Sequence, residues 1–253
     1  MSIIKKVKEK NDTLFGFHSV YEALKADRRK IYKIFFSPQK KTLKRFKKIE
    51  KIARRKNIKI EKAAPDFFDK MTGSVNHQGV IAKTSFFPVG EASEVITLMK
   101  QKQSCFILIM DSIEDPHNLG ALIRTALCAG VDYILIPKDR SARPSSAVSR
   151  SSAGAMEHAK IFMVTNTAAT LRSLKENNAW ISGLDANGDT SLFDSDLTGS
   201  IVLVIGGEHK GIRPGVRKEC DFLLSIPNRG DINSLNASVA GGIAMFEALR
   251  QRS

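Results

Sequence analysis

One segment near the middle of the chain combines a helix start with polar side chains that could do chemistry. It reads Asp111-Ser-Ile-Glu-Asp115-Pro116-His117-Asn118-Leu119-Gly120, and Arg124 follows it. Asp115 suits an N-cap and Pro116 the first helical position, so a helix is expected to begin directly after a strand and a short loop. At about 100° per residue, Asn118 and Arg124 fall on opposite flanks of the apolar stripe of that helix. From spacing alone, two interpretations of Asn118 and Arg124 are about equally favoured. They could form part of a ligand site, or they could be surface polar residues of a well-capped helix.

A glycine-rich segment, Gly206-Gly207-Glu208-His209-Lys210-Gly211, follows an apolar run of strand length. Glycines at the carboxyl end of a parallel strand let a ligand approach the backbone closely. The segment is not a Walker A phosphate loop, because Ile212 stands where the lysine must be, and it lacks the G-x-G-x-x-G spacing of dinucleotide-binding folds. A tight strand-to-helix turn would explain the same residues.

The third segment spans Ile226–Ala240. A strand ends at Pro227, a polar loop follows, and a helix then opens with small and polar residues. Ser234 could be the N-cap of that helix, and Asn236 a polar residue of its first turn. The helix is expected to bury an apolar stripe. This stripe consists of Val239, Ile243, Phe246 and Leu249. Taken individually, each of the three segments is more often structural than catalytic.

The apolar runs predict the framework that must position these segments. From residue 104 onward, strand-length runs alternate with helical patterns, which favours a mostly parallel sheet with helices on both faces. The expected strands are Cys105–Met110, Tyr133–Ile136, Lys160–Val164, Trp180–Leu184, Ile201–Ile205 and Phe222–Ile226. The expected helices are His117–Ala129, Thr167–Asn177, Pro214–Glu219 and Leu235–Gln251.

A second, smaller α/β pattern precedes this framework. Its expected extended segments are Leu14–Phe17, Ile31–Phe36, Ile58–Ile60 and Val80–Ala82, and its expected helices are His18–Ala26 and Lys40–Lys56. We therefore predict a basic tail at residues 1–12, a small α/β domain at residues 13–85, a linker at residues 86–103 and the large α/β domain at residues 104–253.

Positive charge is concentrated in the first third of the chain. Residues 1–83 hold 23 Lys and Arg against 8 Asp and Glu, a net +15, whereas residues 84–253 have a net charge of −1. A block of one sign repels itself, and a polyanionic partner relieves that repulsion. Nucleic acid is therefore favoured over a merely solvated lysine surface. Charge alone does not choose between RNA, DNA and an acidic membrane.

The composition excludes several other classes. The longest apolar runs are far too short to span a bilayer, and no apolar region follows the basic start as it would in a signal peptide. The three cysteines, Cys105, Cys128 and Cys220, are odd in number and widely spaced. They fit neither a disulfide framework nor a zinc site, so we expect a cytoplasmic protein without a metal.

Considered together, the three segments resemble the three motifs of the SpoU (TrmH) family, in order and in spacing. The matching patterns are Asp-Pro-x-Asn-x-Gly followed by Arg124, then Gly-Gly-Glu-x-x-Gly, then Ile-Pro-x-x-Gly-x-x-Ser-Leu-Asn-x-Ser-Val-Ala. The basic domain is similar to the substrate-binding domain of that family through Phe15-Gly16-Phe17-His18-Ser19-Val20 and His77-Gln78-Gly79-Val80. The resemblance covers roughly residues 12–250, and it outweighs the structural explanations of the single motifs.

The resemblance implies an RNA ribose 2′-O-methyltransferase of the SPOUT class that uses S-adenosylmethionine. Members have a trefoil knot near the carboxyl end, which periodicity could not predict because knots are rare exceptions to chain topology. Members are also homodimers with sites near the subunit interface. By motif matching, the cofactor-binding residues are Gly206, Gly207, Ile226, Pro227 and Leu235.

The same matching implies that Arg124 assists the acceptor hydroxyl, with Asn118, Glu208, Ser234 and Asn236 as the other catalytic-site residues. Since arginine normally stays protonated, stabilising the developing alkoxide is the role that is easier to defend physically. Two residues depart from the family pattern. Asn228 replaces a methionine and Ala237 a common valine, and neither change removes a proposed catalytic atom.

A basic domain ahead of the methyltransferase domain resembles the arrangement in enzymes that modify a guanosine of 23S ribosomal RNA. Relatives that modify tRNA usually lack this domain, so ribosomal RNA is the favoured substrate. A tRNA ribose 2′-O-methyltransferase remains the first alternative. A non-catalytic RNA-binding ribosome-assembly factor is the second, and the presence of all five catalytic-site residues argues against it.

Overall fold

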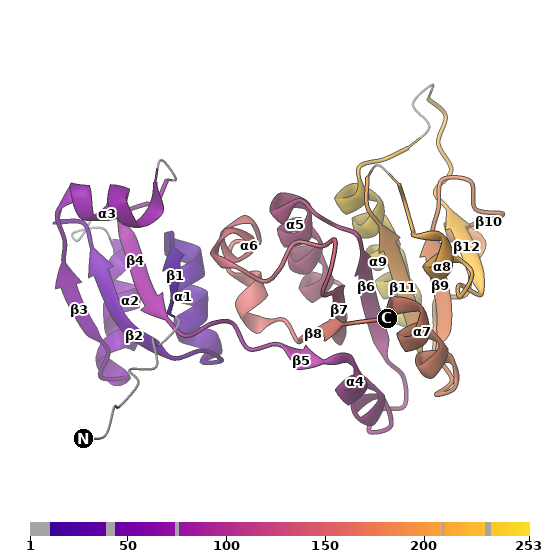
Figure 1. Cartoon of the computed structure of the whole chain (residues 1–253), viewed down its shortest axis with the longest axis horizontal. Coiled ribbons are helices and arrows are strands. Elements are labelled where there is room, and N and C mark those ends of the chain that lie inside the picture. Colours follow the sequence, from indigo (N-terminus) through magenta and orange to yellow (C-terminus); the bar gives the residue numbers. More distant parts are fainter. Residues whose placement is uncertain (1–10, 39–43, 74–75, 209, 231–233) are drawn as a thin grey trace, which may run out of the picture. The chain divides into compact units, whose positions relative to one another are not determined.

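The computed structural model describes residues 11–38, 44–73, 76–208, 210–230 and 234–253 (Figure 1). The chain folds as two compact units that divide between Pro88 and Val89. The predicted basic tail lies almost wholly outside the described residues, as does the start of the predicted helix Lys40–Lys56. Within the described part of the chain, no helix is both long enough and apolar enough to span a bilayer.

The described part of the small unit contains a four-stranded sheet, with strand order β1-β4-β2-β3, and the α-helices α1, α2 and α3. Strand β4 is antiparallel to β1 and β2, and β3 is parallel to β2. The strands are β1 (Asp12–Phe15), β2 (Ile31–Phe36), β3 (Lys59–Lys62) and β4 (Val80–Thr84), and the helices are α1 (Phe17–Ala26), α2 (Lys44–Arg55) and α3 (Pro65–Thr72).

The helices of the small unit cover both faces of its sheet. Ile34 and Phe36 of β2 belong to the core shared with α1 and α2. Phe35, which lies between them, belongs to a separate cluster with Phe68 of α3. Because successive strand residues point to opposite faces, α3 lies on the face opposite α1 and α2.

The large unit is built on an eight-stranded sheet with strand order β10-β12-β9-β11-β6-β7-β8-β5, and every strand pairing described in it is parallel. This confirms the predicted α/β class and mostly parallel sheet. The strands are β5 (Gly90–Glu91), β6 (Phe106–Asp111), β7 (Tyr133–Pro137), β8 (Ile161–Val164), β9 (Trp180–Leu184), β10 (Thr190–Ser191), β11 (Ile201–Gly206) and β12 (Phe222–Ser225). The α-helices are α4 (Ala92–Met99), α5 (Pro116–Cys128), α6 (Ser146–Ser151), α7 (Thr167–Lys175), α8 (Pro214–Arg217) and α9 (Ala237–Arg252), and short 3-10 helices span Ala155–His158 and Leu192–Asp194.

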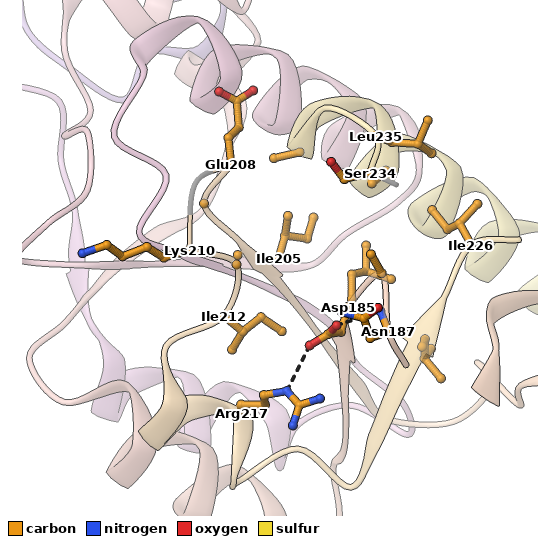
Figure 2. Close-up of a pocket in the computed structure, with 18 of the residues that line it drawn as sticks. Asp185, Asn187, Ile205, Glu208, Lys210, Ile212, Arg217, Ile226, Ser234 and Leu235 are labelled. Carbon is orange, nitrogen blue, oxygen red and sulfur yellow. Dashed lines mark hydrogen bonds and ion pairs between the residues drawn. The ribbon is translucent and has the colours of Figure 1, made fainter. Parts of the chain in front are cut away.

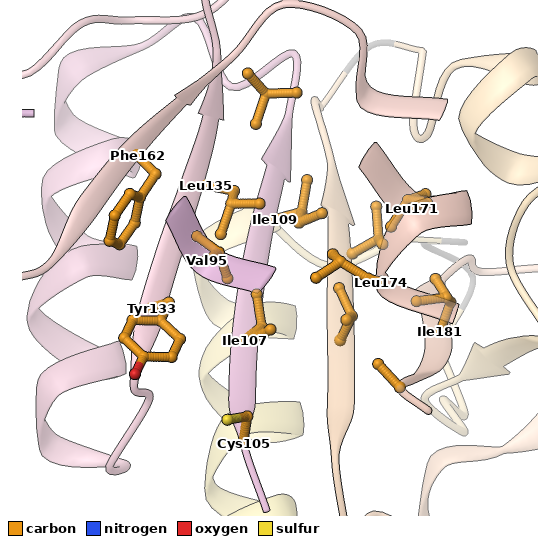
Figure 3. Packing of buried hydrophobic residues seen from close by; sticks show 14 of the residues in the cluster. Val95, Cys105, Ile107, Ile109, Tyr133, Leu135, Phe162, Leu171, Leu174 and Ile181 are labelled. Carbon is orange, nitrogen blue, oxygen red and sulfur yellow. The ribbon is translucent and has the colours of Figure 1, made fainter. Parts of the chain in front are cut away.

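One face of the large sheet packs against α4, α7 and α8. Val95 of α4 and Leu171 of α7 share a buried cluster with Ile107 and Ile109 of β6 (Figure 3). The opposite face packs against α5 and α9. There the side chain of Ile205 lies so close to Gly241 of α9 that a Cβ at Gly241 would come within 2.4 Å of the Ile205 Cδ1 atom.

The predicted linker at residues 86–103 is wrong for most of its length. Residues 90–99 form β5, which pairs with β8, and α4, whose Val95 and Met99 are buried in the core of the large unit. Glu91 and Glu94 form a capping box that starts this helix. Hydrophobic periodicity does not predict α4, because the helix is short and buries only two side chains.

The predicted buried face of the last helix is also wrong. Val239 and Phe246 are 50% and 49% exposed, whereas Gly241, Ala244 and Ala248 are buried. Small residues let α9 approach the sheet and α5 closely. The larger apolar side chains consequently form an outward stripe on the surface of a single chain.

Gly120 of α5 illustrates how tightly the motif segments pack. A Cβ at this position would lie 2.0 Å from Ser151 Oγ and 2.8 Å from the backbone nitrogen of Ser152. We expect Gly120→Ala to lower the free energy of unfolding by about 1–3 kcal/mol, because α5 and α6 would have to separate. Gly215→Ala is the matched control, since a Cβ there meets nothing within 4 Å and should leave stability unchanged or slightly higher. Denaturant unfolding of both variants measures the difference, and an equal loss in both would contradict this packing argument.

Candidate active site

The first motif starts a helix at the carboxyl end of β6. The Asp115 carboxylate accepts hydrogen bonds from the backbone N–H groups of His117 at 3.0 Å and Asn118 at 3.3 Å, and Pro116 is the first helical residue. The predicted cap is therefore confirmed. It places the Asn118 side chain in the first turn of α5, beyond the edge of the sheet.

The second motif is a loop that folds back on itself after β11. The Gly211 N–H donates to the Gly207 carbonyl at 2.9 Å, and a Cβ at Gly206 would lie 2.2 Å from the carbonyl carbon of Gly211. A Cβ at Gly207 would lie 2.3 Å from the carbonyl oxygen of Ser112. Glycine is therefore required for this loop to close beside the loop that follows β6, and closure presents Glu208 next to Asn118.

The third motif ends at the start of α9. Asn236, not Ser234, is the N-cap of this helix, and its Oδ1 atom accepts from the backbone N–H groups of Ser238 at 2.9 Å and Val239 at 3.3 Å. These bonds fix the rotamer of the Asn236 side chain. Its Nδ2 atom is consequently directed away from the helix, toward the other two motifs.

Three side chains, one from each motif, meet in a hydrogen-bonded cluster. Asn118 Nδ2 donates to Glu208 Oε1 at 2.9 Å, and Asn236 Nδ2 donates to Asn118 Oδ1 at 3.2 Å. Asn236 Nδ2 also donates to Glu208 Oε1. Two amides thus converge on one carboxylate. The cluster holds three segments together that are far apart in the sequence.

A cavity of about 420 Å³ adjoins this cluster (Figure 2). Loops that follow β9, β11 and β12 form its walls, at the carboxyl ends of parallel strands where α/β sheets bind ligands. Residues lining it include Asp185, Asn187, Gly206, Gly207, Glu208, Ile226, Ser234 and Leu235. Pro227 belongs to the same loop as Ile226 but does not line the cavity.

Asp185 gives the cavity a carboxylate. Its Oδ2 atom accepts from Arg217 Nε at 3.0 Å and its Oδ1 atom from the backbone N–H of Asn187 at 2.9 Å (Figure 2). Burial raises the pKa of Asp185, but these hydrogen bonds outweigh burial and hold its pKa below the usual value. The carboxylate therefore stays ionised near neutral pH and can accept hydrogen bonds from a ligand.

The chain matches two family models. Residues 105–246 match the SpoU rRNA Methylase family, and residues 13–89 match the RNA 2′-O ribose methyltransferase substrate-binding domain. The chain belongs to the SpoU rRNA methylase family.

Curated relatives of this SpoU methylase align along almost the whole chain. The 23S rRNA (guanosine-2′-O-)-methyltransferase RlmB of Xanthomonas campestris is 38% identical over 245 residues, which is 96% of this chain and 98% of the relative. The protein of the same name from Escherichia coli is 36% identical over 243 residues, 96% of this chain and all of the relative.

Solved structures share the fold of this SpoU methylase. The SpoU methyltransferase AviRb from Streptomyces viridochromogenes, in complex with the cofactor AdoMet, superposes with a TM-score of 0.79 at 21% identity, over 95% of this chain and 90% of that one. The TrmH/SpoU tRNA modifying enzyme of A. aeolicus superposes with a TM-score of 0.53 at 24% identity, over 63% of this chain and 83% of that one.

Two predicted catalytic residues of this SpoU methylase lie outside the cluster within a single chain, Ser234 and Arg124. Ser234 lines the adjoining cavity of about 420 Å³, whereas Arg124 does not. Arg124 is exposed on α5, six residues after Asn118 and therefore about 240° around the helix axis. Among the described residues, its guanidinium has no hydrogen-bond or ion-pair partner.

A buried ion pair that the sequence did not predict lies beside the site of this SpoU methylase. Asp111, at the end of β6, is fully buried and accepts from the backbone N–H of Arg213 at 2.9 Å and from its Nε at 2.8 Å. Arg213 also donates to Thr167 Oγ1 at 3.0 Å. The pair ties the loop after β11 to β6. A charged residue that directly follows a buried strand was the available signal.

The predicted absence of a metal site is not contradicted by the side chains that the structure describes. Among these, no three His, Cys, Asp or Glu residues are grouped closely enough to hold a metal ion.

Proposed function

We propose that this SpoU methylase transfers a methyl group from S-adenosylmethionine to the 2′-hydroxyl of a guanosine ribose in 23S ribosomal RNA, in the cytoplasm. The observation that carries the proposal is the meeting of Asn118, Glu208 and Asn236 beside a cavity of about 420 Å³. That volume lies within the range of ordinary cofactor sites. The names of the full-length relatives supply the guanosine and the 23S RNA.

The residues of the cavity fit S-adenosylmethionine. Ile205, Ile212 and Ile226 provide apolar walls for a flat base, and the ionised Asp185 provides an acceptor for hydroxyl or amino groups. Because Gly206 has no side chain, its backbone can face a ligand directly. When bound, the sulfonium group supplies a methyl group that is already electrophilic.

The protein must then assist the acceptor, because a ribose hydroxyl is a poor acid. We assign to Arg124 the stabilisation of the oxygen as it loses its proton and becomes negatively charged. Asn118, Glu208, Ser234 and Asn236 orient the ribose. The hydrogen bonds among Asn118, Glu208 and Asn236 keep the acceptor oxygen aligned with the donor, and alignment supplies much of the rate.

We also propose a two-fold homodimer in which Arg124 of one copy reaches the cluster of the other. Arg124 is exposed, and the outward stripe of α9, with Val239 and Phe246, lies on the helix that packs against α5. An apolar stripe of this kind is typical of a protein–protein interface. A dimer would cover it and complete each site with a guanidinium.

We also propose that the large unit contains the trefoil knot of the family, and two observations support it. The loop after β11 is closed so tightly that Gly206 has no room for a Cβ beside Gly211. The chain then forms β12 on the far side of β9 and returns, so that α9 packs against β11 and α5.

Ribosomal RNA needs a large phosphate-binding surface, and α2 offers one. Its buried residues are Phe46, Ile49 and Ala53. Of its seven exposed cations, Arg45 lies over the rings of Phe17 and Phe46, and the other six occupy an arc of about 120° on the side opposite the buried residues. The six cations of this arc are Lys44, Lys47, Lys48, Lys51, Arg54 and Arg55. Like charges three or four residues apart destabilise a helix, and bound phosphates would relieve that repulsion.

We expect the double variant K48E/K51E to weaken RNA binding by at least tenfold at low salt. Two lost phosphate contacts should also reduce the slope of log K against log salt concentration by about two. The control K62E/K70E makes the same change of charge on β3 and α3 and should lower the slope by less. Filter binding across a salt series tests this, and equal slopes in the two variants would remove α2 as the RNA-binding surface.

Mapping of 2′-O-methyl groups in ribosomal RNA tests the function as a whole. Cells that lack this gene should lose the modification at one guanosine of 23S RNA and regain it when the gene is restored. Loss of a tRNA methylation instead would support the tRNA alternative. A map that does not change would contradict the proposal.

A further inference from the structure

A second hollow, of about 580 Å³, lies next to the cavity proposed for the cofactor. It is bounded by the loops that follow β6 and β7, again at the carboxyl edge of the sheet. The glycine loop divides the two hollows, because Gly207, Glu208, Lys210 and Gly211 line both of them. Asn118 lines the second hollow, so the hydrogen-bonded cluster stands at the boundary between the two.

The backbone around this hollow is strained. Ser112 and Arg140 both line it, and both have left-handed backbone angles, with φ of 64° and 54°. Residues with a side chain rarely adopt this conformation, and strain of this kind is found at functional sites. A hydrogen bond of 2.8 Å from the Ala142 N–H to the Ile113 carbonyl ties the two loops together and holds them in place.

The residue after Arg140 also carries an unusual group. The Ser141 hydroxyl is buried and has no hydrogen-bond partner in the described part of the structure. Unsatisfied buried polar groups are rare in folded proteins, because each loses its hydrogen bonds to water. The loop after β7 therefore has two unfavourable features side by side, at Arg140, which lines the hollow, and at Ser141, which does not. A ligand contact of Arg140 is a reason for keeping this loop conformation.

Three cations line the hollow, Arg140, Lys210 and Arg213, and of these only Arg140 has a left-handed backbone angle. Lys210 is exposed and has no ion-pair partner among the described residues, and the carboxylate of Glu114 also lines the hollow.

Arg213 is bound to the buried Asp111, and Asp115 caps α5. Glu208 accepts from the amides of the cluster. The Arg140 guanidinium, by contrast, has no hydrogen-bond or ion-pair partner among the residues that the structure describes. It is exposed, and its backbone is held rigidly at the edge of the hollow.

We propose that this second hollow binds the acceptor nucleotide of the RNA, and that Arg140 holds a phosphate group of that nucleotide. The inference rests on the proposed function and adds a substrate subsite to it. A guanidinium binds a phosphate through two parallel hydrogen bonds, which fixes orientation as well as position. A nucleotide held there would have its ribose at the boundary of the two hollows, next to Asn118 and Glu208.

The test compares Arg140→Ala with Arg143→Ala, a variant of the same loop with the same change of charge. Arg143 is exposed and lines neither hollow. We expect Arg140→Ala to lower kcat/KM for RNA roughly 10- to 100-fold, mainly through KM, and to reduce the salt slope by about one. Arg140→Lys should recover part of the loss, and Arg143→Ala should stay within about twofold of the unmodified protein.

Calorimetry with S-adenosylmethionine shows whether each variant is folded, because the cofactor affinity should not change. If Arg140→Ala behaves like Arg143→Ala, the subsite is wrong. If KM rises but the salt slope does not change, Arg140 contacts something other than phosphate, and its proposed role is wrong. The absence of methyl transfer by the unmodified protein would instead contradict the proposed function, so the two failures can be told apart.

Discussion

Replacement of Arg124 with alanine should lower kcat roughly 10²–10³-fold while RNA affinity stays within a fewfold. The proposed role of the guanidinium is to stabilise an oxygen that becomes negatively charged only in the transition state, and removal of one such donor has effects of this size. Because Arg124 is exposed on α5, its loss should not disturb the fold. Single-turnover methyl transfer and RNA filter binding measure the two quantities, and an unchanged turnover would refute the assignment.

Mixing experiments test whether Arg124 acts across the proposed dimer. Arg124→Ala and a cluster variant such as Asn236→Ser should each be almost inactive alone. If the guanidinium comes from the other copy, a heterodimer of the two variants contains one intact site, so an equal mixture should regain about a quarter of the unmodified activity. No recovery after verified subunit exchange would mean that Arg124 serves the site of its own chain, and the dimer model of the site would be wrong.

The Asn236→Ser variant has the second large effect that we expect, a loss of turnover of about 100-fold with little loss of stability. Serine is a good N-cap and preserves the acceptor for the first turn of α9. It cannot replace the Nδ2 donor that reaches Asn118 and Glu208. A small displacement of positioning groups can cost about two orders of magnitude in rate.

Asn236→Ala serves as the comparison, because it removes both functions of the side chain. It should lose the same activity and, in addition, about 1 kcal/mol of stability from the missing cap. Thermal unfolding and single-turnover rates separate the two contributions. Equal stability of the serine and alanine variants would contradict the capping role, and nearly full activity of Asn236→Ser would contradict the role of the cluster.

The sequence predicted the fold well where local signals and burial agree. Strands β2 and β9 have the predicted bounds, and α5 begins where Asp115 and Pro116 place it. Helix α3 was missed because Phe68 is its only fully buried side chain. The helical period of α9 was predicted correctly, but the apolar face that it was expected to bury is partly exposed. Periodicity shows which face of a helix is apolar, not whether that face packs inside the chain or is left on its surface.

The site could be predicted from the family resemblance, not from local sequence patterns. No local pattern indicates that Asn118, Glu208 and Asn236 should touch, and the resemblance of three ordered motifs supplied that expectation. Their convergence depends on strand order, which places β6 beside β11 although the two are far apart in the sequence. Asp111 and the cavity carboxylate Asp185 are single charged residues at strand ends. That position is a signal in the sequence, but it does not show that Asp111 pairs with Arg213 or that Asp185 faces a cavity.

Methyl transfer to an unmodified 23S transcript by the purified protein, with an isotopically labelled methyl donor, tests the central claim most directly. A ribose 2′-O-methyl group blocks alkaline cleavage of the neighbouring phosphodiester bond, so the label should appear in one alkali-resistant dinucleotide that begins with guanosine. Label that appears on a base, or no label in the RNA at all, would contradict the account.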